Sequence, residues 1–288
     1  MTLNELLVNE KIDPRVAIIL RHRPTSPELR KKLPWLAAER PDVFNAYQQQ
    51  QGEPLEKALT NLAGSGFVAS FIGHEPGRAL FVGLYSIESA KQVSPADLAR
   101  KPAFDELTKL GSNTTLRPIW FDLRKTAVCG EWQGKLIVAW PPPERSWWRR
   151  AHKNEIPVAA ILEESALTGA MPAWHELELD WADLNLLPAS WKAALSHWRG
   201  IYFIFDESDG KGYVGSAYGS DNLLGRWRNY AARGHGGNAL LRPRNKEAFR
   251  FSILERVSPD MSPADVVALE SSWKRRLHTR QPFGLNEN

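Results

Sequence analysis

Two short stretches, Gly200-Ile201-Tyr202-Phe203-Ile204-Phe205 and Tyr213-Val214-Gly215, decide the fold of the last third of this chain. Their aromatic and β-branched residues favour β-strands. The acidic, glycine-containing stretch 206–210 between them is typical of a turn, so the sequence predicts an antiparallel hairpin. Because side chains alternate along a strand, Tyr202 and Tyr213 can converge across the pair. Aromatic pairs on hairpins are commonly structural, however, so this pair alone does not indicate chemistry.

A helix is predicted after the hairpin, capped by Ser220 or Asp221 and ended by Gly234. Arg226 and Tyr230 are four residues apart and therefore share one face of this helix. A cation and a phenol would then lie on the same side, next to the hairpin.

The last helix is predicted from its start signal, Ser262-Pro263-Ala264-Asp265, which combines an N-cap, a first-turn proline and an acid. Its apolar stripe is expected to contain Val266, Trp273 and Leu277. Glu270 falls within that stripe, where the pattern favours leucine. A carboxylate there needs a cation or hydrogen bonds. The spacing leaves two interpretations open, a salt bridge to an arginine and a metal ligand.

The order of these elements resembles the GIY-YIG endonuclease family. The resemblance covers residues 195–288 and is carried by five features in sequence order: Gly200-Ile201-Tyr202, Tyr213-Val214-Gly215, Arg226 in Arg-Trp-Arg-Asn-Tyr, Glu270 in Leu-Glu-Ser-Ser-Trp, and the terminal Gly-Leu-Asn286. It implies an α+β fold with a small antiparallel three-stranded sheet flanked by helices. It also implies hydrolysis of DNA phosphodiester bonds.

By this resemblance, Glu270 would hold Mg²⁺, for which Mn²⁺ can substitute, and Arg226 would neutralise charge on the phosphate. A tyrosine would take the proton of the attacking water; Tyr202 is favoured, with Tyr213 sharing the role. Because a tyrosine pKa near 10 is high for a base, nearby cations such as Lys211 would have to lower it.

Two further positions are assigned to the site by the resemblance. Tyr230 stands where many members place histidine; it is interpreted as an active-site hydroxyl, with packing under the helix as the alternative. Asn286 corresponds to the terminal asparagine of the family, which orients the site and contacts the phosphate.

Basic and aromatic residues outside these motifs are candidate DNA contacts, because cations meet phosphates and indoles stack on bases. The glycine-rich loop 235–244 is either a phosphate contact or a solvated loop, and residues 145–150 either contact DNA or cover a domain interface. The candidates are Lys211, Arg228, Arg233, His235, Asn238, Arg242 and Arg244, together with Trp147, Trp148 and Arg149.

The sequence predicts two domains, 1–190 and 191–288. The first is expected to begin with helices and to continue as a β-rich, tryptophan-rich body that recognises the target. Its predicted helices are 4–9, 26–38 and 41–49, and its predicted strands are 67–72, 79–87, 120–123, 131–132, 136–140 and 158–162. A helix over 190–197 and a strand over 249–254 are predicted for the remainder.

Charge and tryptophan are distributed unevenly along the chain. Residues 191–288 hold 15 Lys and Arg against 10 Asp and Glu, a net +5, whereas the first 190 hold 22 against 23, a net −1. This asymmetry indicates that the C-terminal part faces a polyanion. Nine of the 12 tryptophans lie between Trp120 and Trp198, mostly outside the predicted catalytic domain.

The single cysteine, Cys129, excludes an internal disulfide and a cysteine-based zinc site. No apolar stretch is long enough for a membrane span, and the first residues do not resemble a secretory signal. A cytoplasmic protein without a membrane partner is expected.

The leading hypothesis is a metal-dependent DNA endonuclease of the restriction type, acting on foreign DNA, either modified or unmodified. The alternatives are a structure-selective repair or recombination nuclease and a non-catalytic DNA-binding protein on a nuclease fold. One active site cuts one strand, so cleavage of both strands would need a homodimer or two successive events.

Overall fold

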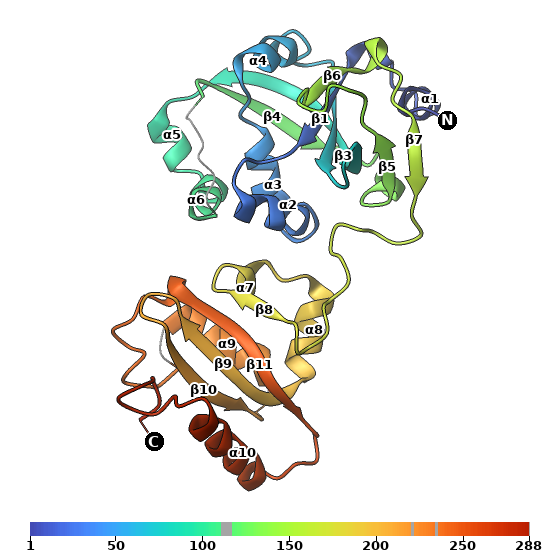
Figure 1. Cartoon of the computed structure of the whole chain (residues 1–288). Helices are drawn as coiled ribbons and strands as arrows, with labels where there is room; N and C mark the ends of the chain where they lie inside the picture. The colour runs from blue at the N-terminus through green and yellow to red at the C-terminus, as the bar shows by residue number, and fades with distance from the viewer. Residues whose placement is uncertain (111–116, 220–221, 234–235, 288) are drawn as a thin grey trace. The chain divides into compact units, whose positions relative to one another are not determined.

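The computed structural model describes residues 1–110, 117–219, 222–233 and 236–287. Within it the chain divides into two compact units, Met1–Gly169 and Ala170–Asn288 (Figure 1). The division lies upstream of the expected boundary at residue 190. The reason is that β8 (Glu178–Asp180) pairs with β11 (Phe249–Val257), which places residues 178–180 in the second unit.

The first unit begins with helices and continues with strands. Its α-helices are α1 (Leu3–Asn9), α2 (Pro27–Glu39), α3 (Pro41–Gln48), α4 (Glu53–Thr60), α5 (Pro95–Ala99) and α6 (Pro102–Lys109). Its strands are β1 (Ala17–His22), β2 (Phe67–Gly73), β3 (Arg78–Gln92), β4 (Ile119–Lys125), β5 (Leu136–Ala139), β6 (Trp148–Arg150) and β7 (Val158–Ile161). Single 3₁₀ turns lie at Pro14–Val16, Gly130–Trp132 and Ala151–Lys153.

The seven strands form one mixed sheet in the order β6-β1-β2-β3-β5-β7, with β4 also paired to β3. Only β1 and β2 pair in parallel among the described strands, and α2, α3 and α4 lie in the connection between them. A parallel pair needs such a long crossover, and it is normally buried on both faces. All six residues of β1 are buried accordingly.

The expected strand over residues 131–132 is wrong. Residues Gly130–Trp132 form a 3₁₀ turn, preceded by Cys129 with a φ of 61° and followed by Gly134 with a φ of 72°. These two left-handed residues fold the chain back between β4 and β5, so no extended segment fits there. The other predicted strands and helices of this unit are present.

The second unit contains a four-stranded antiparallel sheet in the order β10-β9-β11-β8. Besides β8 and β11, its strands are β9 (Arg199–Asp206) and β10 (Lys211–Ala217). Its helices are α7 (Asp183–Leu186), α8 (Ala189–His197), α9 (Asn222–Arg233) and α10 (Pro263–Arg276), and a 3₁₀ turn lies at Lys246–Ala248. The predicted α+β class is confirmed. The sheet has one strand more than expected, because three-residue β8 is too short to give a periodic signal.

Helices cover both faces of this sheet. Along β9 and β10, Tyr202 points to one face and Ile201 and Val214 point to the other. Trp227 of α9 packs edge-on against Tyr202, 6.4 Å between ring centroids, whereas Val266 of α10 joins the apolar cluster of Ile201 and Val214. Thus α9 and α10 lie on opposite faces, and both lie next to β10, the edge strand.

The predicted stripe of α10 needs one correction. Val266 is buried and Trp273 packs against the core cluster, as expected, but Leu277 is 40% exposed and Leu269 packs there instead. The helix ends at Arg276, so Leu277 no longer follows the helical repeat. The N-terminal end is as predicted, because the Ser262 hydroxyl accepts a hydrogen bond from the Asp265 N–H.

The unit boundary also changes the meaning of the charge distribution. Residues 170–190 hold four acidic residues and no Lys or Arg, so the second unit has 15 basic and 14 acidic residues, a net +1. The first unit has 22 and 19, a net +3. The predicted charge contrast between the domains therefore disappears, and only local clusters of charge can indicate where a polyanion binds.

Candidate active site

The hairpin of β9 and β10 brings two tyrosines together. Tyr202 lies opposite Gly215, and Tyr213 lies opposite Ile204, so the two phenols are diagonal neighbours with ring centroids 6.5 Å apart. A side chain on Gly215 would overlap the Tyr202 hydroxyl. Glycine at this position is therefore required for the Tyr202 ring to cross β10.

Helix α9 adds a third tyrosine. The Tyr202 hydroxyl donates a hydrogen bond of 3.1 Å to the Tyr230 hydroxyl. The Tyr230 ring lies 6.1 Å from the Tyr202 ring and 5.9 Å from the Tyr213 ring. Tyr202 and Tyr230 are 1% and 2% exposed, whereas Tyr213 is only partly buried. Of the three phenols, Tyr213 is therefore the one that solvent and a substrate can reach.

Arg226, one turn before Tyr230 on α9, has an exposed side chain. Its positive charge acts on Tyr202 and Tyr213, because it lowers the pKa of both phenols. The i, i+4 spacing therefore places a solvent-accessible cation beside the tyrosine cluster, as the sequence predicted.

Glu270 reaches the same region from α10, at the edge strand β10. Its Oε2 accepts a short hydrogen bond from the Ser216 hydroxyl, and its Oε1 lies 2.7 Å from the Lys274 Nζ. The carboxylate also raises the pKa of Tyr213, which places the two groups within electrostatic reach. The partner cation is a lysine of the same helix, not the arginine that one interpretation of the sequence expected.

Both hairpin phenols hold their protons more firmly than free tyrosine. Burial raises the pKa of Tyr202 well above its usual value, and the neighbouring Tyr230 and Tyr213 raise it further. Burial likewise raises the pKa of Tyr213, with Tyr230 and Glu270 adding to the effect. Arg226 opposes these effects without reversing them. At neutral pH both hydroxyls are therefore protonated and act as hydrogen-bond donors.

Asn286 holds the C-terminal segment against β10. Its Oδ1 accepts a 3.0 Å hydrogen bond from the Val214 N–H, and its Nδ2 donates a 2.8 Å bond to the Val214 carbonyl. The side chain is 2% exposed. Because its acceptor and one of its two N–H donors are bonded to the residue between Tyr213 and Gly215, Asn286 is placed to fix the hairpin rather than to reach a substrate.

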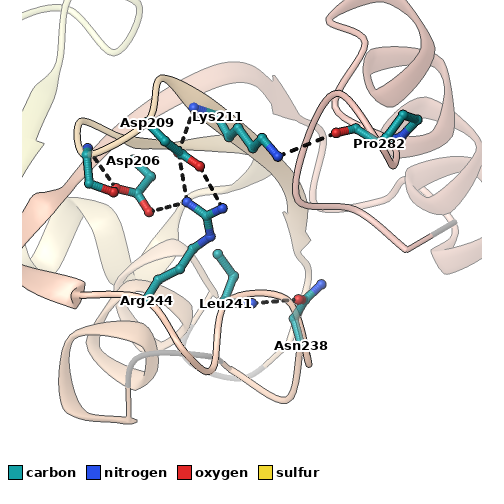
Figure 2. Close-up of polar contacts among 8 residues, drawn as sticks. Asp206, Asp209, Lys211, Asn238, Leu241, Arg244 and Pro282 are labelled. Atoms are coloured by element: carbon teal, nitrogen blue, oxygen red, sulfur yellow. Dashed lines mark hydrogen bonds and ion pairs between the residues drawn. The ribbon is translucent and has the colours of Figure 1, made fainter.

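Several of the predicted DNA contacts are engaged within the protein. Figure 2 shows the Arg244 guanidinium between Asp206 and Asp209, with distances of 2.6 to 2.8 Å. The Asn238 amide oxygen accepts from the Leu240 and Leu241 N–H groups. The Arg244 contacts tie the loop after α9 to the β9–β10 turn, and the Asn238 contacts lie within that loop, so both residues are bonded inside the unit.

The remaining candidate DNA contacts differ in whether their side chains are hydrogen-bonded within the protein and in how far they are exposed. Lys211 Nζ lies 3.5 Å from the Pro282 carbonyl, and Arg149 donates to the Pro141 and Pro142 carbonyls and to Asn154. Trp148 is half-buried in β6. The exposed candidates are Arg228, Arg233, Arg242 and Trp147, and His235 lies outside the described residues.

A groove of about 670 Å³ between α8 and α9 collects two of these exposed cations. Arg228 and Arg233 line it together with Lys192, and the other lining residues are uncharged. Lys192 was not predicted from the sequence, because its helix precedes the hairpin motif. Ser216 and Lys274 were also missed, although the four-residue spacing from Glu270 to Lys274 is a readable signal.

The structure describes no group of three or more His, Cys, Asp or Glu side chains that could hold a metal ion. It also describes no helix long and apolar enough to cross a membrane.

The second unit thus gathers three tyrosines, the exposed Arg226 and the carboxylate of Glu270 around β10. Residues 199–285 match the family model of the GIY-YIG catalytic domain. The second unit therefore contains a GIY-YIG catalytic domain over residues 199–285, which supports the assignment of an endonuclease.

A solved structure also resembles the chain: the catalytic domain of the homing endonuclease I-TevI, at 25% sequence identity and a TM-score of 0.27, covering 31% of this chain and 98% of that one. No match was found among the curated proteins.

Proposed function

We propose that this protein is a Mg²⁺-dependent endonuclease of the restriction type, which cuts foreign DNA, either modified or unmodified, in the cytoplasm. In this proposal the first unit recognises the target and the second cuts it. The observation that supports it best is the intact group of polar side chains around β10: three tyrosines, Arg226 and Glu270. Each of them has a role in phosphodiester hydrolysis that its environment permits.

The single carboxylate fits a hard divalent ion that keeps most of its water. Mg²⁺ is bound in proteins by one or two carboxylates plus substrate phosphates, at oxygen ligands only. Glu270, with the Ser216 hydroxyl bonded to it, supplies such oxygens, and Lys274 would have to release Oε1. A bound ion would polarise a phosphate oxygen and the attacking water.

Tyr213 is the phenol best placed to meet the substrate. Tyr202 is buried and donates to Tyr230, whereas Tyr213 is the more accessible hydroxyl. We therefore assign Tyr213 to holding the attacking water and Tyr202 to packing beside it while it donates to Tyr230, which reverses the preference drawn from the resemblance. Since its pKa is raised, Tyr213 would orient the water rather than deprotonate it as a free tyrosinate.

Arg226 and the groove between α8 and α9 would contact the DNA backbone. The exposed guanidinium of Arg226 can form paired hydrogen bonds to a phosphate and neutralise charge that grows in the transition state. Lys192, Arg228 and Arg233 would bind phosphates farther along the strand.

The decisive experiment compares two isosteric variants in a plasmid-cleavage assay with Mg²⁺ or Mn²⁺. Glu270→Gln removes the proposed ligand, and we expect at least a 100-fold loss of rate. The matched control is Glu255→Gln in the same unit, where the side chain accepts from the Trp273 Nε1 and a glutamine oxygen can still do so. Equal rates in both variants would contradict the assignment.

The choice of substrate needs a second assay. Phage DNAs carrying different base modifications, unmodified duplexes and branched duplexes are offered to the wild-type protein. Preference for modified or foreign DNA supports the restriction role. Preference for branched DNA would instead indicate a repair nuclease, and tight binding without cutting would indicate a DNA-binding protein.

A further inference from the structure

The first unit contains a small pocket in which arginines predominate. It lies at the end of β1, beside the β2–β3 turn, and has a volume of about 150 Å³. Its charged lining residues are Arg21, Arg23, Arg30 and Arg78, with His74, Glu75 and Glu144. Four guanidinium groups therefore face two carboxylates.

Arg21 is the buried member of this group. Its side chain is 3% exposed, and its guanidinium carbon lies 4.8 Å from the centre of the Trp140 ring, a cation–π contact. One Nη donates to the main-chain carbonyl of Glu144, and Nε has no hydrogen-bond partner. Burial lowers the pKa of Arg21, and only Glu144 opposes this effect while Arg23 adds to it.

The carboxylates neutralise only part of the pocket, because Glu75 pairs with Arg78 at 3.2 Å and the other arginines have no carboxylate of the described residues at that distance. Glu144 Oε2 lies 3.9 Å from Arg21 and 3.8 Å from Arg23, which is longer than a hydrogen bond. Arg30 donates to the Pro24 and Thr25 carbonyls, which carry no net charge. A buried cation without a close anion is costly, so the pocket is suited to receive one.

The size and shape of the pocket limit the anion. Pockets that enclose a whole small-molecule ligand are usually about 300–1,000 Å³, so this one accommodates a group rather than a nucleotide. Several guanidinium forks lining one pocket match the oxygens of a phosphate.

We propose that the arginine pocket of the first unit binds a single phosphate group of the DNA backbone. The choice of DNA as the source of the phosphate rests on the proposed function. The pocket would anchor target DNA to the first unit independently of the catalytic domain.

The test measures DNA affinity of the full-length protein in EDTA, so that the result does not depend on cleavage. Arg23→Ala/Arg78→Ala changes two residues whose side chains are 58% and 48% exposed, so the fold should persist. The matched control is Arg100→Ala, because Arg100 pairs with Asp97 at the same i, i+3 spacing as Arg78 with Glu75. Thermal melts check the fold of each variant.

We expect the double variant to bind a labelled duplex on the order of tenfold more weakly, and its plot of log affinity against log salt to lose about one unit of slope. The control should match the wild type. Unchanged affinity and slope in the double variant would overturn the proposal. If calorimetry then showed inorganic phosphate binding to the wild type only, the pocket would be a free-anion site instead. Absence of Mg²⁺-dependent cleavage would refute the proposed function without altering this binding result.

Discussion

The bonding of Asn286 leads to a prediction that separates a structural role from contact with the substrate. Replacing it by alanine would leave the Val214 N–H and carbonyl without their partners, in a strand residue that is 0% exposed. Each buried backbone group left unsatisfied costs about 1–3 kcal/mol. Since water can enter the space vacated by the amide and satisfy part of this loss, we expect Asn286→Ala to lower the free energy of unfolding by about 2–4 kcal/mol.

The assay is urea unfolding of the full-length protein followed by tryptophan fluorescence, together with DNA affinity and cleavage rate on the same samples. Because Val214 lies between Tyr213 and Gly215, the variant should also lose cleavage rate, while DNA affinity changes little. Asn286→Asp keeps the acceptor for the Val214 N–H but opposes its carbonyl with a carboxylate, so it should not restore stability. Phe283→Ala, in the same segment but 76% exposed, is the control.

The opposite pattern would refute this reasoning. If Asn286→Ala unfolded at the wild-type urea concentration and lost DNA affinity, the side chain would contact the phosphate, as the family resemblance suggested. A stability loss equal to that of Phe283→Ala would show that the two hydrogen bonds to Val214 contribute nothing measurable.

Three further outcomes are expected. The pKa of Tyr202 is raised in the folded protein, so the unfolded chain loses its phenol proton first as the pH rises. The free energy of unfolding should therefore fall above pH 10 by about 1.4 kcal/mol per pH unit. Urea unfolding of Tyr202→Phe should show a weaker fall. Burial lowers the pKa of His22 to about 4. The free energy of unfolding should therefore fall by about 3 kcal/mol as the pH decreases from 6.5 to 4, because the unfolded chain binds the proton first. His22→Gln should remove this loss. With one active site per chain, supercoiled plasmid should be nicked before it is linearised on gels. A linear product that rises with protein concentration would instead indicate cleavage by a homodimer.

Local sequence predicted the elements that carry the site. The β9–β10 hairpin, the start of α10 at Ser262-Pro263 and a strand over residues 249–254 were all predicted, and the structure confirms them. Each depends on residues close in the chain, namely strand alternation and helix capping. The order of these elements was enough to indicate the catalytic family.

The partners of the site residues were not predictable in this way. Glu270 is bonded to Ser216 from another element, Tyr202 donates to Tyr230 across the sheet–helix contact, and Asn286 reaches back to Val214. Each of these contacts joins residues far apart in sequence, whose distance depends on how elements pack. Solvent exposure, which distinguishes Tyr213 from Tyr202, is likewise a property of the packed unit.

The sequence by itself determined the hairpin, the helix starts and the family of the second unit, because these follow from neighbouring residues. Tertiary structure alone decided where that unit begins and which phenol is accessible. It also showed which arginines bond within the protein and which gather around a pocket. The reason is physical: hydrogen bonding and burial are set by atoms that meet only after the chain has folded, whereas strand and helix signals act before it does.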